Sequence, residues 1–295
     1  MMPERREVKL SGGRDACRNR HSRGRWRLSQ IDFQFRRAPA GLSGAVVGFA
    51  QRRDGQAWDA GRELPMANPM IQFMLGGDYF VDGAVMPRAA LWGPTVSSAA
   101  SHTDAPAEVF MVVLTAAGAA RLACSDLAPL MNRAIDLGAL DARAWRNMPA
   151  RIAEAGGFED RVALAFDHLG ELLADPRPVR TRTLTLAGAI LGHRVRGTVA
   201  SLAAEVGLSS RGLHKAFERE VGCGPKRLMR IARLQRVLRA LHPRPWSPVV
   251  AEDALLEYVD QAHLDRDFLD LTRLSRAAYV AAKVVRGDPL VHTVV

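Results

Sequence analysis

Residues 198–235 read TVASLAAEVGLSSRGLHKAFEREVGCGPKRLMRIARLQ, and this stretch decides the expected fold. Thr198 can cap a helix, and the apolar residues after it recur at the spacing of a single helix face as far as Gly207. Gly207 can adopt the left-handed conformation that ends a helix, and Ser209 can cap the next helix at once. Two short helices joined by such a turn indicate a helix-turn-helix.

The second helix of this pair is expected over residues 210–220, with a basic outer face. Leu213, Ala216 and Phe217 fall on its inner side. The residues predicted to meet DNA are Ser209, Ser210, Arg211, His214, Lys215 and Arg219. In a helix-turn-helix the second helix lies in the major groove, where arginine and lysine read guanine edges and serine hydroxyls hold phosphates. Helix pairs of this shape also occur in proteins that never touch DNA, and the cationic outer face is what favours DNA.

A long helix is expected after Gly224-Pro225, as far as about Leu241, because proline starts helices and apolar residues then recur on one face. Its other positions are basic: Lys226, Arg227, Arg230, Arg233, Arg236 and Arg239. Such a run is commonly a solvated face. Placed between two candidate DNA readers, it can also supply phosphate contacts.

A second candidate unit follows, in which residues 257–279 read EYVDQAHLDRDFLDLTRLSRAAY. Together, residues 198–279 resemble the DNA-binding domain of the AraC/XylS family of bacterial transcription regulators. The matching residues of the first half are Leu202-Ala203, Gly207-Leu208-Ser209, Arg211, Leu213, Phe217, Val221-Gly222, Pro225, Arg230, Arg233 and Gln235. Those of the second half are Trp246, Tyr258, Asp260-Gln261-Ala262-His263-Leu264, Arg266, Phe268, Leu271-Thr272, Leu274-Ser275 and Tyr279.

The resemblance implies two helix-turn-helix units, joined by a long helix, that enter successive segments of the major groove. By motif position it implies that the base-facing residues of the first unit are Arg211, His214 and Lys215. It implies the same role in the second unit for Gln261, His263 and Arg266.

The second unit departs from the family pattern. Glu257 and Arg273 stand where the family has glycine, and Arg276 stands where it has proline. The loss of a glycine puts a left-handed turn in doubt. Asp265 and Asp267 also place carboxylates on the helix that should approach phosphates. We therefore expect this unit to bind DNA weakly, or to act mainly by holding the first unit in place.

The positive charge lies where the DNA reader is expected. The chain holds 41 Lys and Arg against 31 Asp and Glu, and residues 176–250 hold 15 against 3. A basic segment attracts polyanions in general, so the charge alone indicates nucleic acid or another anionic surface without specifying a sequence. No run reaches the roughly 18 to 20 apolar residues of a membrane helix, so no membrane partner is expected.

The three cysteines, Cys17, Cys124 and Cys223, share no disulfide or metal-binding spacing, which favours a reducing compartment. The expected location is the bacterial cytoplasm, in association with the nucleoid. Residues 1–38 are rich in arginine, glycine and serine and lack the apolar segment of a secretory signal. They are expected to be a disordered basic tail, with an over-extended reading frame or a mitochondrial presequence as alternatives.

The N-terminal half is expected to be β-rich. Apolar segments at residues 42–50, 70–75 and 109–114 are separated by turn signals such as those at 52–55 and 76–78. These segments predict a small β-barrel or sandwich. From about residue 126 the pattern becomes helical, at 127–131, 142–155, 158–174 and 180–192.

The predicted fold class is therefore α+β. Its expected parts are the tail 1–38, a β-rich sensor or dimerisation domain 39–125, a helical connector 126–195, the double helix-turn-helix domain 196–285 and a tail 286–295. This order is similar to that of AraC-type regulators whose N-terminal half senses a ligand or dimerises.

The β-rich domain shows no sign of catalysis. A cupin-type metal site needs several converging histidines, and of the eight histidines only His102 falls in this region. No nucleophile elbow, phosphate loop or dinucleotide fingerprint occurs either. We expect no enzyme activity, no cofactor and no metal.

Two sets of residues in the β-rich domain are candidates for contact with a small molecule. The aromatic candidates, for which core packing is the favoured role, are Trp58, Phe73, Trp92 and Phe110. The polar candidates are Arg88, Arg121 and His102.

The sequence thus predicts a sequence-specific transcription regulator whose partner is double-stranded DNA. A small-molecule effector or homodimerisation would control it through the N-terminal half, while the long helix and Ser209 anchor phosphates. The alternative is an interaction protein that does not bind DNA, or a decayed regulator whose second unit has lost its reading role.

Overall fold

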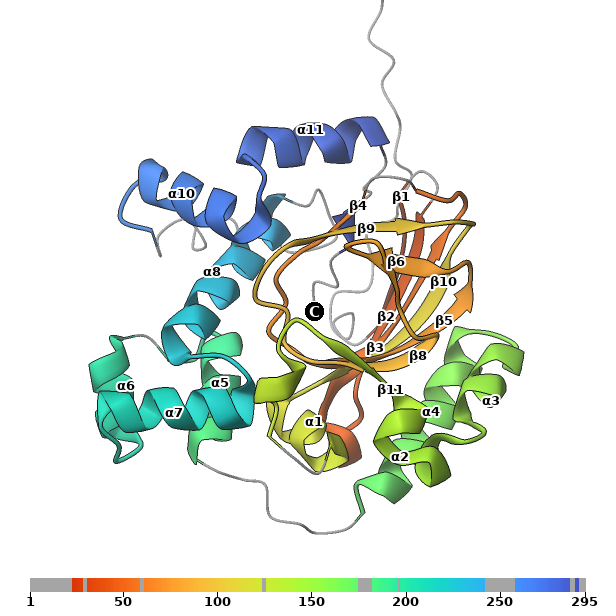
Figure 1. Ribbon diagram of the computed structural model, residues 1–295, viewed down its shortest axis with the longest axis horizontal. Coiled ribbons are helices and arrows are strands. Elements are labelled where there is room, and N and C mark those ends of the chain that lie inside the picture. Colours follow the sequence, from red (N-terminus) through yellow and green to blue (C-terminus); the bar gives the residue numbers. More distant parts are fainter. Residues whose placement is uncertain are drawn as a thin grey trace, which may run out of the picture.

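The computed structural model describes residues 23–28, 31–58, 61–123, 126–174, 182–195, 197–241, 258–286 and 290–291. Two β-sheets form the N-terminal half, and helices form the C-terminal half (Figure 1). This arrangement confirms the predicted α+β class.

The two sheets are almost entirely antiparallel. The larger sheet has the order β1 (Arg23–Leu28), β2 (Ile31–Arg37), β3 (Val46–Asp54), β10 (Glu108–Leu114), β5 (Met70–Gly76), β8 (Ala89–Trp92) and β11 (Ala134–Asp136). The smaller has the order β12 (Leu290–Val291), β4 (Gly61–Glu63), β9 (Ala99–Thr103), β6 (Tyr79–Val81) and β7 (Ala84–Val85). Among the described strands, only β12 and β4 pair in parallel.

The three strands predicted from sequence are neighbours at the centre of the larger sheet, in the order β3, β10, β5. Both faces of this sheet are covered, which explains why these strands read as continuous apolar runs. In β10, Phe110 and Val112 belong to the core on the helical side. Val109 and Met111 belong to a second core. Residues of both sheets contribute to that second core, Tyr79 from β6 and Trp92 from β8 among them.

Two boundaries differ from the prediction. Strands β1 and β2 include residues 23–37, which the sequence placed in the tail, while residues 1–22 lie outside the described part of the chain. Strand β11 occurs where the pattern read as helical. Its three residues are too few to show a period, and pairing with β8, about 40 residues earlier, is what makes them a strand.

Helices cover one face of the larger sheet. They are α1 (Ala116–Ala123), the 3-10 turns η1 (Ala40–Leu42) and η2 (Ala128–Leu130), α2 (Leu137–Trp145), α3 (Met148–Glu154) and α4 (Phe158–Leu172). The buried guanidinium of Arg161 fastens α4 to the sheet by donating to Gln51 Oε1 at 2.7 Å and to Glu108. It also donates to the carbonyl oxygen of Ile152 at 3.0 Å.

The C-terminal half contains α5 (Arg182–Leu191), α6 (Val199–Glu205), α7 (Ser210–Val221), α8 (Pro225–Leu241), α10 (Gln261–Thr272) and α11 (Arg276–Arg286). Helix α5 packs on α7 and α8, so it belongs to the body of the first unit and not to a connector that extends to residue 195. Trp246 and Glu257 lie outside the described residues. Among the described helices, none has the length and apolar character that crossing a membrane requires.

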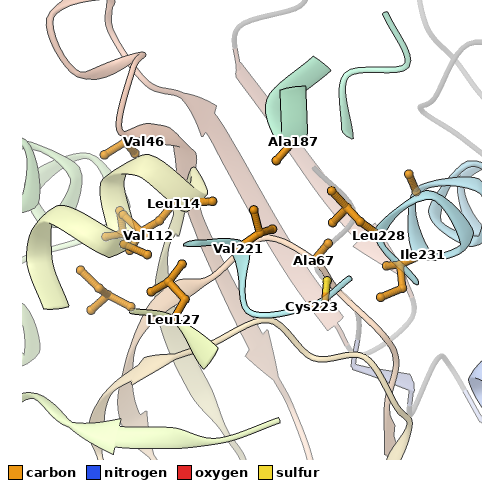
Figure 2. Packing of buried hydrophobic residues seen from close by; sticks show 14 of the residues in the cluster. Val46, Ala67, Val112, Leu114, Leu127, Ala187, Val221, Cys223, Leu228 and Ile231 are labelled. Atoms are coloured by element: carbon orange, nitrogen blue, oxygen red, sulfur yellow. The ribbon is translucent and has the colours of Figure 1, made fainter. Parts of the chain in front are cut away.

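A single hydrophobic core joins the first unit to the β-rich half. Figure 2 shows Val221, Cys223 and Leu228 in the same cluster as Ala67 and Leu127. Burial raises the pKa of the Cys223 thiol to about 12, which makes this residue a packed side chain and not a nucleophile. The first unit is therefore held against the β-rich half by apolar packing.

Polar contacts reinforce this junction. The Leu127 amide donates to the carbonyl oxygen of Arg219, at the end of α7, at 2.9 Å. The Arg227 guanidinium donates through Nε to the carbonyl oxygen of Val96 at 3.2 Å. Both bonds connect residues more than 90 positions apart, so they fix the orientation of α7 and α8 on the β-rich half.

Candidate nucleic-acid interface

The turn between α6 and α7 is built as the sequence predicts. The Thr198 hydroxyl accepts a hydrogen bond from the Ser201 amide at 3.2 Å, and the Ser201 hydroxyl accepts one from the Thr198 amide at 3.0 Å. Gly207 is left-handed, with φ +75°. The Ser209 hydroxyl caps α7 by accepting from the Gly212 amide at 3.1 Å. Both predicted caps are thus confirmed.

Helix α7 presents one polar face to solvent. Leu213, Phe217 and Val221 are fully buried and fix the rotation of the helix. All six residues predicted for DNA contact in the first unit are exposed: Ser209, Ser210, Arg211, His214, Lys215 and Arg219. The structure therefore brings the predicted set together on one surface.

The basic residues of this surface differ in whether an acidic side chain lies at ion-pair distance. His214 Nε2 lies 3.1 Å from Glu218 Oε1, and Arg219 Nη2 lies 2.6 Å from Glu220 Oε1. The hydrogen bond from Glu220 raises the pKa of Arg219. Within the described ranges, Arg211 and Lys215 have no acidic partner at ion-pair distance. The free positive charge is therefore in the N-terminal part of α7, the part that contacts base edges in helix-turn-helix proteins.

Most of the described basic side chains of α8 are engaged within the protein, contrary to the expectation of a solvated, phosphate-binding face. Arg227 bonds the β-rich half, as described above, and Arg236 is buried. Arg230 Nη2 lies 2.8 Å from Asp267 Oδ1 and 2.6 Å from Asp270 Oδ2. Helix α8 is packed on most of its circumference. Of its basic side chains that the structure describes, only that of Lys226 is exposed.

The second unit presents a smaller cationic surface on α10. Gln261 and Arg266 are exposed. His263 is half-buried, with its ring centroid 5.2 Å from that of Tyr258, and its amide donates to the Asp260 cap at 2.6 Å. Of the three residues predicted for base contact in this unit, two are therefore presented to solvent.

The two carboxylates that the sequence placed on the phosphate-facing helix, Asp265 and Asp267, are both paired with arginines. Asp267 is buried and faces α8, where Arg230 and Arg233 contact it. Asp265 is exposed, but its Oδ1 accepts from Arg276 Nε at 2.5 Å, and this hydrogen bond holds the pKa of the Asp265 carboxyl below its usual range. Both negative charges have a cationic partner.

Arg273 preserves the turn after α10 although it is not a glycine. It has φ +60° and ψ +20°, the left-handed conformation that ends a helix. A residue with a Cβ is strained there by about 1 to 2 kcal/mol. The turn geometry that the sequence put in doubt is therefore kept, with local strain.

Replacing Arg273 by glycine is expected to stabilise the protein by about 1 kcal/mol, because glycine removes the strain but adds freedom to the unfolded chain. Chemical denaturation of the purified full-length chain measures the effect. Arg273→Ala is the matched control, since it removes the same charge but retains the Cβ. Equal stabilities of the two variants would contradict the assignment of the strain to the backbone.

The residues predicted for ligand contact in the β-rich half are spread over different surfaces. Arg88 Nη2 pairs with Asp78 Oδ1 at 2.7 Å on the surface, and Arg121 donates to the carbonyl oxygen of Leu173. His102 stacks on Phe80 with ring centroids 4.4 Å apart. None of these three side chains belongs to the core that the two sheets share.

The aromatic candidates divide between the two faces of the larger sheet. Phe73 and Phe110 stack on each other with centroids 6.2 Å apart, in the core on the helical side. Trp58 and Trp92 flank Tyr79 in the second core, at 6.4 Å each. The favoured packing role is thus confirmed for the two phenylalanines.

Sequence reasoning missed the polar groups of the second core. Tyr79 Oη donates to the carboxyl group of Glu63, a half-buried residue of β4. Burial raises the pKa of Glu63 to about 8, although the charge of Arg52 opposes the shift. The Arg52 guanidinium lies 5.0 Å from the ring centroid of Trp58. No clear sequence signal indicates this cluster, because Arg52 lies in the segment 52–55 that reads as a turn, whereas β3 continues to Asp54.

Three buried polar atoms near this cluster have no hydrogen-bond partner among the described residues. They are the indole nitrogens of Trp58 and Trp92 and the hydroxyl of Ser101. Buried donors of this kind are normally satisfied, so the second core offers hydrogen bonds that a ligand or water can accept. In the described part of the chain, no group of His, Cys, Asp or Glu side chains is placed to hold a metal ion.

No protein-family model and no curated protein matches the sequence. The chain is similar to solved structures of ToxT from Vibrio cholerae. One, in a P21 crystal form, has a TM-score of 0.44 and 11% identity, covering 79% of this chain and 98% of that chain. A structure of unsaturated fatty acid bound wild-type ToxT has a TM-score of 0.42 and 10% identity, covering 76% and 90%. What this protein does must therefore be inferred from its own residues.

Proposed function

We propose that the protein is a sequence-specific transcription regulator of the AraC/XylS type that reads double-stranded DNA with α7 in the major groove. The observation that carries the proposal is the free pair of cations, Arg211 and Lys215, on the exposed N-terminal part of a helix whose inner face is fully packed. A guanidinium held on such a helix can donate two parallel hydrogen bonds to a guanine.

The fixed position of α7 supports base-specific recognition of DNA over nonspecific attraction to its phosphates. Discrimination between bases requires donors fixed in direction, and a mobile cation supplies only nonspecific attraction to phosphates. The buried side chains of Leu213 and Phe217 fix the rotation of the helix. The Ser209 hydroxyl caps its start, and the Leu127 amide donates to a backbone carbonyl oxygen near its end. We assign phosphate contact to Ser210 and Lys226, because most of the α8 arginines are engaged elsewhere.

The second unit has a supporting role in this proposal. Gln261 and Arg266 of α10 would contact a further segment of the same duplex, since α7 and α10 both pack on α8, toward its two ends (Figure 1). The pairing of Asp267 with α8 sets the position of α10. This unit is expected to add affinity and to contribute little base discrimination.

Control is proposed to come from the N-terminal half. Because the first unit shares a core with the β-rich half, a small molecule between the two sheets, or a second copy of the chain bound to them, would alter the position of α7. The protein would then act in the bacterial cytoplasm, without a membrane partner and without catalysis.

An interaction protein is the second candidate, and exposed apolar residues of the second unit favour it. Val259 is 90% exposed and Leu269 is 53% exposed. Single exposed apolar side chains are ordinary, but two near one helix can also mark a protein contact. Measuring DNA affinity at increasing salt concentration separates the two functions. A DNA-reading protein should prefer one sequence and lose affinity steeply as salt rises, whereas an interaction protein should not discriminate that sequence from random duplex.

Arg211→Ala is expected to lower the affinity for the preferred sequence by roughly 1 to 3 kcal/mol and to relax discrimination at one or two base pairs. Selection of genomic fragments bound by the full-length protein would give the preferred sequence, and fluorescence anisotropy would measure both variants. Arg219→Ala, on the same helix but paired with Glu220, is the control and should keep the preferred sequence. The reading role would be wrong if Arg211→Ala selected the same sequence at unchanged affinity.

A further inference from the structure

A cavity of about 390 Å³ lies among α2, α3 and α4. These helices form a group on the opposite side of the molecule from α6 (Figure 1). The cavity is lined by Arg143, Ala144, Arg146, Asn147, Met148, Arg151 and His168. Its volume falls within the range of small-molecule sites, and its wall is polar and cationic.

Three guanidinium groups line this one hollow. Arg143, Arg146 and Arg151 are exposed, and none has an acidic partner at ion-pair distance in the part of the chain that the structure describes. Arg143 follows a kink at Asp141, whose carboxylate caps the next turn of α2 by accepting from the Arg143 amide at 3.0 Å. A concave surface lined by charges of one sign concentrates the field, so the cavity attracts anions.

Two further polar side chains accompany the arginines. His168 Nε2 is buried and has no hydrogen-bond partner among the described residues. Its ring packs edge to face on Trp145, with centroids 4.9 Å apart, which holds the imidazole in place. The pKa of His168 is lowered, mainly by burial and further by the charge of Arg151, against the opposing charge of Glu171. Asn147 precedes α3 but its side chain makes no cap, so its amide is available to the cavity.

We propose that this cavity is a binding site for a small molecule that carries several anionic oxygens, such as a phosphate ester or a polycarboxylate. Arginine is suited to such ligands because its planar fork donates two parallel hydrogen bonds to carboxylate or phosphate. Three arginines around one cavity match a compact ligand of two or more negative charges. A duplex backbone is convex and would touch only the rim, so a small molecule fits better than DNA. The site is independent of the DNA-reading proposal.

The test is titration calorimetry of the full-length protein with pyrophosphate and, separately, with citrate, at constant ionic strength. Saturable binding at one site per chain is expected for at least one of them, and the one that binds identifies the ligand class. Arg146→Gln and Arg151→Gln should each weaken binding roughly tenfold or more, since each removes charge-assisted hydrogen bonds. Circular dichroism checks that the variants are folded.

Arg133→Gln is the matched control, because it removes an exposed arginine that does not line the cavity. It should change the affinity by less than about twofold, as expected of a solvent-screened surface charge that does not touch the ligand. The proposal is overturned if neither anion binds saturably, or if Arg133→Gln weakens binding as much as Arg146→Gln. It is also overturned if Arg146→Gln weakens duplex DNA binding and leaves anion binding unchanged.

Discussion

Glu63→Gln is expected to raise the free energy of unfolding at pH 8 by roughly 3 to 5 kcal/mol, with a change of less than about 1 kcal/mol at pH 5. The pKa of Glu63 is raised from 4.5 to about 8 in the folded protein. At low pH the carboxyl is neutral in both states. Between pH 4.5 and pH 8 only the unfolded chain releases the proton, so the folded state loses stability as the pH rises. A glutamine is neutral throughout and can still accept the Tyr79 hydrogen bond.

Urea denaturation of wild type and Glu63→Gln at pH 5 and pH 8 measures this difference. Glu205→Gln is the control, because Glu205 is an exposed carboxyl on α6. The free energy of unfolding of this control should equal that of the wild type at pH 5 and at pH 8. If wild type and Glu63→Gln lost stability in parallel between pH 5 and pH 8, the buried neutral carboxyl would be ruled out.

Asp267→Ala is expected to lower the free energy of unfolding by about 2 to 4 kcal/mol, because the partly buried Arg233 loses its carboxylate and Arg230 keeps only Asp270. Asp267 accepts from Arg230 Nε at 2.9 Å and from Arg233 Nη2 at 3.5 Å. Its side chain is 9% exposed, and the two arginine side chains are 21% and 25% exposed, so solvent screens the interaction only in part. The loss of stability should come mainly from a weaker contact between α8 and α10.

Hydrogen exchange of residues 261–286, together with denaturation of the full-length chain, would locate and measure the effect. Asp265→Ala is the matched control on the same helix. Its pair with Arg276 is exposed, and surface pairs contribute less than about 1 kcal/mol. Equal losses for Asp265→Ala and Asp267→Ala would show that the buried pair does not attach the second unit to α8.

Both units contribute apolar side chains to the core that includes the β-rich half, Phe217 from the first and Phe268 from the second among them. The second unit is also attached to α8 through Asp267 and Asp270. The Arg230 hydrogen bond also holds the pKa of Asp270 below its usual range. A change in the β-rich half would therefore reach α7 through packed side chains, and would reach the second unit through α8 and through β12, which pairs with β4.

Interactions between residues near each other in the sequence were sufficient to predict the helix-turn-helix. The caps at Thr198 and Ser209, the left-handed Gly207 and the start of α8 at Pro225 all depend on contacts within a few residues, and each was predicted. The short strands were not predicted, because β4, β6 and β11 have three residues each and exist through their pairing with distant strands.

The sequence by itself determined which residues lie on the outer face of α7, because helical periodicity and capping are interactions between near neighbours. Only the tertiary structure decided which of the basic residues are free. Arg230 meets Asp267 37 positions away, and Arg227 meets Val96 131 positions away, whereas Arg211 and Lys215 have no ion-pair partner among the described residues. The reason is physical, since whether a charge is paired depends on the groups that folding brings within a few ångströms, and sequence spacing does not specify those groups.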